Sequence, residues 1–79
     1  MDKNACFRNI PKVDVLLEDP AIIALCDEYG RDIAVDCIRS CTDDLRAFIG
    51  KSDDMAEIQR RTDSLVQDIR RAAEALFTP

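Results

Sequence analysis

The stretch that decides the fold of this 79-residue chain is residues 10–49, IPKVDVLLEDPAIIALCDEYGRDIAVDCIRSCTDDLRAFI. Within residues 31–49 the apolar side chains step by four, three, four and three positions: Ala34, Ile38, Cys41, Leu45 and Phe48. At about 100° per residue these positions form one broad face of an α-helix. The pattern predicts a long helix over residues 31–49, ended by Gly50, whose apolar face is the main hydrophobic surface of the chain.

Two short helices are predicted before the long one. Pro11 suits the first turn of a helix, where its missing N–H costs nothing, and three apolar residues follow at helical spacing: Val13, Leu16 and Leu17. Asp19 then provides a cap, Pro20 takes the first helical position, and Gly30 is suited to end the second helix. Helices this short are not stable alone, so both are expected to pack on the long helix.

A fourth helix is expected after a break near residues 50–54, where Ser52 or Asp54 can act as a cap. Its apolar residues alternate by three and four positions over about three heptads: Met55, Ile58, Thr62, Leu65, Ile69, Ala72 and Leu76. Two interpretations of this seam stay open. It packs against the preceding helices, or it also meets another chain or a missing domain as a docking or dimerisation surface.

These patterns predict an all-α fold, with two short helices packed on a long helix plus a long C-terminal helix. Residues 1–9 lack a periodic pattern and are expected to form a flexible N-terminal arm. Residues 10–50 then form the helical domain and residues 51–79 the C-terminal helix. A chain of 79 residues allows one small domain of marginal stability.

The charge balance limits the classes of partner. The chain carries 16 acidic and 11 basic residues, a net charge of −5, which is the wrong sign for a general nucleic-acid binder and gives no reason to expect a DNA partner. A local basic edge remains compatible with this total. No basic segment followed by an apolar run occurs, so no secretory signal is expected, and no stretch approaches the roughly 20 apolar residues that span a bilayer. A cytoplasmic location without membrane contact is expected.

The side chains that carry most enzyme chemistry are missing or badly placed. Histidine is absent, and two glycines cannot build a phosphate-binding loop. Adjacent acidic pairs point about 100° apart on a helix and do not form a catalytic dyad. The cysteines are too widely spaced for a typical metal site and are expected to be small buried hydrophobic residues: Cys6, Cys26, Cys37 and Cys41. No catalytic residue, metal or cofactor is predicted, so a self-contained enzyme is disfavoured.

Five basic residues are the candidates for contacts with RNA phosphates: Arg8, Lys12, Arg31, Arg39 and Arg46. Arg39 and Arg46 are seven residues apart and therefore share one side of the long helix, with Arg31 nearer its apolar edge. The alternative is that Asp36 and Asp43 pair with these arginines, although exposed pairs of this kind contribute only a few tenths of a kcal/mol. The arginines of the last helix are interleaved with acids and are expected to form a solubilising face: Arg60, Arg61, Arg70 and Arg71.

Several segments together resemble a known family: Ile10-Pro11-Lys12-Val13-Asp14-Val15-Leu16-Leu17, Pro20, Leu25, Tyr29-Gly30-Arg31, Ile38-Arg39, Asp43-Asp44-Leu45-Arg46 and Ile49. They are similar to the N-terminal domain of bacterial selenocysteine synthases, the L-seryl-tRNA(Sec) selenium transferases. The resemblance covers residues 7–50, and the last helix is similar to the segment that leads into the large domain of that family. Cys37, Cys41 and Thr42 stand where the family tends to larger or aliphatic residues, which predicts a looser core.

The resemblance implies that residues 10–50 recognise selenocysteine tRNA through its D-arm for a catalytic domain not present here. Enzymes of this family use pyridoxal phosphate (PLP) and selenophosphate to convert seryl-tRNA(Sec) to selenocysteinyl-tRNA(Sec), and form ring-shaped homo-oligomers. Their cofactor lysine belongs to the large domain, so no lysine here inherits that role. An acidic domain suits recognition of the shape of a folded RNA. The alternative function is a helical protein-interaction or oligomerisation module that uses the heptad seam.

Overall fold

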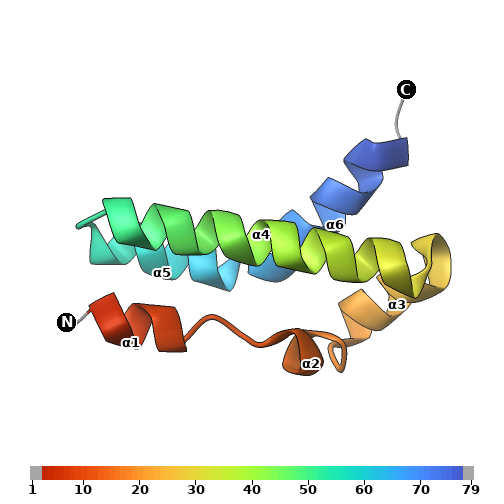
Figure 1. The fold of residues 1–79 in the computed structure, drawn as a ribbon, viewed down its shortest axis with the longest axis horizontal. Coiled ribbons are helices and arrows are strands. Elements are labelled where there is room, and N and C mark those ends of the chain that lie inside the picture. The colour runs from red at the N-terminus through yellow and green to blue at the C-terminus, as the bar shows by residue number, and fades with distance from the viewer. Residues whose placement is uncertain (1–2, 78–79) are drawn as a thin grey trace.

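A computed structural model describes residues 3–77, and helices are the regular secondary structure throughout this range (Figure 1). The all-α prediction is therefore confirmed. In chain order the helices are α1 (Lys3–Arg8), α2 (Val13–Leu16), α3 (Pro20–Tyr29), α4 (Arg31–Lys51), α5 (Met55–Asp63) and α6 (Leu65–Phe77).

The long helix α4 is the axis of the domain, and each of the other described helices contacts it. Its buried side chains lie on the face that the apolar spacing predicted: Ala34, Cys37, Ile38, Thr42, Leu45 and Ile49. Ile38 and Ile49 have no exposed surface. The helix continues through Gly50 to Lys51, two residues beyond the predicted end at Ile49, and the Ser52 N–H donates to the Phe48 carbonyl.

The predicted start and end of α3 are confirmed. The Ala21 N–H donates to the Asp19 carboxylate at 2.9 Å, with Pro20 in the first turn. Gly30 has φ +95° and ψ 149°, a conformation that L side chains rarely adopt, and it joins α3 directly to α4. This sharp reversal lays α3 back against the first turns of α4, where Ile22 and Leu25 become buried.

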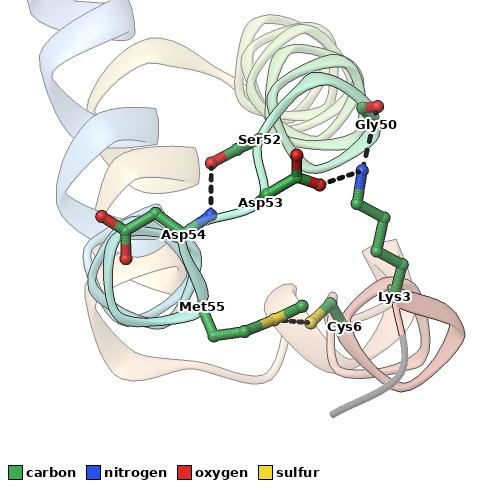
Figure 2. A network of polar contacts seen from close by, with 7 residues as sticks. All are labelled: Lys3, Cys6, Gly50, Ser52, Asp53, Asp54 and Met55. Atoms are coloured by element: carbon green, nitrogen blue, oxygen red, sulfur yellow. Dashed lines mark hydrogen bonds and ion pairs between the residues drawn. The ribbon is translucent and has the colours of Figure 1, made fainter.

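The N-terminal segment differs from the predicted flexible arm. Residues Lys3–Arg8 form α1, in which Cys6 is buried. The Lys3 ammonium donates to the Gly50 carbonyl at 3.3 Å and lies 3.4 Å from the Asp53 carboxylate. Cys6 and Met55 meet through their sulfur atoms, so α1 is held beside the turn between α4 and α5 (Figure 2). A helix of six residues owes its stability to such contacts, which no local pattern reveals. Residues 1–2 of the expected arm lie outside the described range.

The predicted single C-terminal helix is interrupted. Its cap is as expected, since Asp54 accepts from the Glu57 N–H at 3.1 Å. The helix breaks at Ser64, whose hydroxyl donates to the Arg61 carbonyl at 3.1 Å and lies 3.2 Å from the Asp68 carboxylate. Serine side chains that bond to nearby backbone compete with the helical pattern, which explains a break at this residue. Residues 78–79 lie outside the described range.

The heptad seam is used mainly for the core of the domain. Ile58, Leu65 and Ile69 are buried, so the packing interpretation is confirmed for these positions. Beyond Ile69 the register shifts, because Ala73 rather than Ala72 is fully buried and Leu76 remains 65% exposed. In Figure 1 the end of α6 diverges from α4 and leaves the last turn at the edge of the molecule.

The cysteines are free thiols in buried or half-buried positions, as the sequence predicted. Across residues 3–77 no cluster of three or more cysteine and acidic side chains is arranged to hold a metal ion. No helix within the same range is long and apolar enough to cross a bilayer.

Candidate nucleic-acid interface

The five basic residues singled out in the sequence are all exposed in the structure. Arg8 ends α1, Lys12 directly precedes α2, and Arg31 begins α4. Arg39 and Arg46 lie along the middle and second half of α4. None of them is removed from solvent by the core, so each can reach an external ligand.

Arg39 and Arg46 define a common edge of α4, which we call the arginine edge. Seven residues correspond to two helical turns, a rise of about 10 Å. Asp44 and Phe48 lie on the opposite side of the helix, where Asp44 lines a cleft against α5 and α6 and Phe48 contacts Arg61 of α5. The arginine edge therefore faces away from α5 and α6.

The pairing of these arginines with neighbouring acids is incomplete. Arg46 donates to the Asp43 carboxylate at 3.1 Å, and both side chains are exposed. Arg39 forms no ion pair with any residue between 3 and 77, although Asp36 is one turn away. An exposed pair of this kind contributes between 0 and about 1 kcal/mol, so a phosphate group can replace Asp43 as the partner of Arg46.

The two N-terminal helices, α1 and α2, both contact α4. Because Lys3 lies at the C-terminal end of α4, α1 runs in the opposite direction to α4, as Figure 1 shows. Arg8 therefore lies further toward the middle of α4 than Lys3 does. Lys12 follows in the connection to α2, which also contacts α4.

Arg31 is separated from the rest of this group. It lies 15 residues before Arg46 on a continuous helix, a rise of about 22 Å. Its neighbours are Tyr29, Gly30 and Ile33, which line a shallow depression at the corner between α3 and α4. A single small ligand cannot contact Arg31 and Arg46 together, whereas a folded RNA is large enough to do so.

A mixed-charge cleft lies between α4, α5 and α6, with a volume of about 540 Å³. Arg61, one of its lining residues, stacks its guanidinium group 4.3 Å from the centroid of the Phe48 ring. This contact was missed in the sequence, because only the fold brings residues 48 and 61 together. Arg60 and Arg70 are exposed and paired to Glu57 and Glu74, as predicted for a solubilising face, whereas Arg71 lines the cleft.

The cleft does not provide a reactive thiol. Burial raises the pKa of the Cys41 thiol to about 11, and the Asp68 carboxylate acts in the same direction. Burial also raises the pKa of Cys37. The thiolate is the nucleophilic form of cysteine, so Cys41 is unreactive near neutral pH.

The lysines of the described range do not fit a PLP site. A lysine that forms a Schiff base is activated in a desolvated pocket or beside another cation. Lys12 and Lys51 are exposed, and Lys3 bonds to Asp53 and Gly50.

Comparison with known proteins identifies relatives for the first part of the chain. The family model described as selenocysteine synthase N terminal matches residues 7–46. This span contains all five candidate basic residues and ends before α5. An L-seryl-tRNA(Sec) selenium transferase from Salmonella arizonae is 42% identical over 43 residues, which are 54% of this chain and 9% of that relative. The chain therefore matches a small part of the relative's length. No solved structure matches the chain.

Proposed function

The chain belongs to the family of selenocysteine synthase N-terminal domains, and we propose that it binds selenocysteine tRNA through the arginine edge of α4. The observation that carries this proposal is the position of Arg39 and Arg46. Both are exposed on one edge of the long helix, both lie within the span that matches the family, and Arg39 has no ion-pair partner among residues 3–77. The name of the Salmonella arizonae relative supplies the identity of the RNA.

The expected mode of binding is recognition of a folded RNA by shape. Asp32, Asp36 and Asp43 are exposed on the same helix, and the whole chain has a net charge of −5. Few phosphates can be neutralised by such a surface, so its general affinity for RNA is low. Contacts spread over Arg8, Lys12, Arg39 and Arg46 fit the backbone of a structured arm, for which we propose the D-arm of the tRNA.

Selenium transfer itself is assigned in this proposal to the large domain of the parent enzyme, together with PLP. The chain supplies neither a shielded lysine nor a reactive thiol within residues 3–77. Its role in selenocysteine biosynthesis is to hold the tRNA in place for that domain. In a homo-oligomeric parent, several weakly binding surfaces would contact the same tRNA. The affinity of the oligomer would then exceed that of one domain, because linked sites bind more tightly than each site alone.

A proton–nitrogen NMR titration of the ¹⁵N-labelled chain tests this function. We expect tRNA(Sec) to shift the amides near Arg8, Lys12, Arg39 and Arg46 at lower concentration than an elongator serine tRNA does. The amides of α5 should stay unchanged and serve as an internal control. Equal shifts with both tRNAs, or shifts confined to α5 and α6, would contradict the proposal.

A further inference from the structure

Arg46 and Phe48 lie on opposite sides of the buried face of α4. At about 100° per residue, they flank Leu45, which belongs to the core. Arg61 of α5 covers the Phe48 side, with its guanidinium group 4.3 Å from the centroid of the ring. The side of α4 that carries the arginine edge is therefore not the side on which Arg61 packs.

Helix α1 packs on the side of the arginine edge. Around α5, Met55 and Arg61 lie about 120° apart, with the buried Ile58 between them. Because Arg61 covers the far side of α4, Met55 lies toward the near side, where its Sδ atom is 3.7 Å from the Sγ atom of Cys6. Figure 2 shows α1, α4 and α5 around this contact. Helix α1 thus flanks the arginine edge.

Arg8 lies at about the level of Arg46 along α4. The Lys3 ammonium donates to the Gly50 carbonyl at 3.3 Å, and from there α1 runs antiparallel to α4 (Figure 1). Arg8 follows Lys3 by five residues, a rise of about 7.5 Å. Arg46 precedes Gly50 by four residues, a rise of about 6 Å. Neighbouring helices therefore carry these two arginines at similar heights.

Few contacts hold α1 in this position. Cys6 is the buried side chain of α1. The side chains of the ion pair between Lys3 and Asp53 are 36% and 97% exposed, so this pair adds little stability. A helix of six residues is not stable without tertiary contacts. We therefore expect α1 to leave and regain its docked position while the other helices stay folded.

We propose that docking of α1 and binding of RNA at the arginine edge stabilise each other, an inference that rests on the proposed function. In the docked state Arg8 and Arg46 present two positive charges, which the backbone of one RNA arm can contact together. A ligand that prefers the docked state shifts the equilibrium toward it, and docking raises the affinity for that ligand by the same factor. The contacts of α1 with Asp53 and Met55 then act as positioning contacts for Arg8.

Amide hydrogen exchange of the ¹⁵N-labelled chain measures the docking of α1 without RNA. The probes are the Asn9 and Ile10 amides, whose N–H groups donate to carbonyls of α1. Asp53→Asn should speed their exchange by about twofold to threefold, because the ion pair with Lys3 is lost. Asp53→Glu keeps the charge and should restore slow exchange. Asp27→Asn removes the same charge from an exposed position on α3 and should leave the exchange unchanged. Equal exchange in Asp53→Asn and Asp27→Asn would overturn the proposal.

The same amides then report the coupling to RNA. At a concentration of tRNA(Sec) that saturates the shifts at Arg39 and Arg46, exchange at Asn9 and Ile10 should slow by at least about threefold. In Arg8→Ala, tRNA(Sec) at its own saturating concentration should leave this exchange unchanged. A merely structural role of α1 would give equal slowing in both chains and would overturn the proposal.

Failure of the coupling is distinguishable from failure of the proposed function. Shifts at Arg39 and Arg46 without slower exchange at Asn9 and Ile10 would overturn the coupling alone. Absence of shifts at Arg39 and Arg46 would contradict the proposed function and the coupling together.

Discussion

The Sγ atom of Cys6 lies 3.7 Å from the Sδ atom of Met55, although 49 residues separate them in the chain. This contact and the bonds of Lys3 to Gly50 and Asp53 hold α1 across the turn between α4 and α5. The first helix is thus part of the core, and Arg8 is carried on an ordered element.

Replacing Cys6 by alanine should lower the free energy of unfolding by about 1 kcal/mol, because a buried sulfur atom is removed from packed surroundings. Urea denaturation followed by circular dichroism measures this loss. Arg8→Ala is the matched control, since Arg8 is exposed on the same helix and should contribute about 0.5 kcal/mol or less. Equal effects at the two residues would mean that α1 is not docked through Cys6.

Replacing each of the two glycines by alanine should change the free energy of unfolding in opposite directions. Gly30 has φ +95°, so Gly30→Ala should cost about 1–3 kcal/mol of backbone strain. Gly50 lies inside α4 with open space where a Cβ would be, so Gly50→Ala should stabilise by about 0.5–1 kcal/mol. Thermal melting of both variants measures these two changes in stability. A stabilising Gly30→Ala would show that the joint between α3 and α4 is not strained as described.

The Cys41 thiol makes stability depend on pH in the alkaline range. Its pKa is raised to about 11 in the folded chain, so the folded state retains a proton that the unfolded state loses. The stability that the neutral Cys41 thiol contributes is fully present below the pKa of an ordinary thiol, about 8.5, and is lost as pH rises through 11. Between pH 9 and 11 the free energy of unfolding should fall less steeply for Cys41→Ala than for the unmodified chain. Urea titrations across this range provide the comparison, and parallel pH profiles would refute it.

The sequence predicted the parts of the fold that rest on local patterns. The buried face of α4 follows the spacing of Ala34, Ile38 and Leu45, and the caps at Asp19 and Asp54 follow from residue type and position. Helix α1 was missed because its stability comes from Met55 and Asp53, far along the chain. The break at Ser64 was missed because the heptad spacing continues through it.

The candidate site was predictable to a similar degree. Exposure of the five basic residues follows from their charge, and the shared edge of Arg39 and Arg46 follows from helical spacing. The position of Arg8 depends on α1, and the contact between Arg61 and Phe48 depends on the packing of α5, so neither could be read from the chain alone.

The central claim is tested most directly by filter binding of tRNA(Sec) to a full-length selenium transferase that carries this domain. The double variant Arg39→Glu with Arg46→Glu is compared with Arg60→Glu and Arg70→Glu, which change the total charge equally at exposed sites on α5 and α6. For Arg39→Glu with Arg46→Glu we predict that the affinity for tRNA(Sec) falls by at least about tenfold and that about two fewer counterions are released on binding, as read from the salt dependence. For Arg60→Glu with Arg70→Glu we predict an affinity close to that of the unmodified enzyme. Unchanged affinity in the first pair, or equal losses in both, would contradict the account.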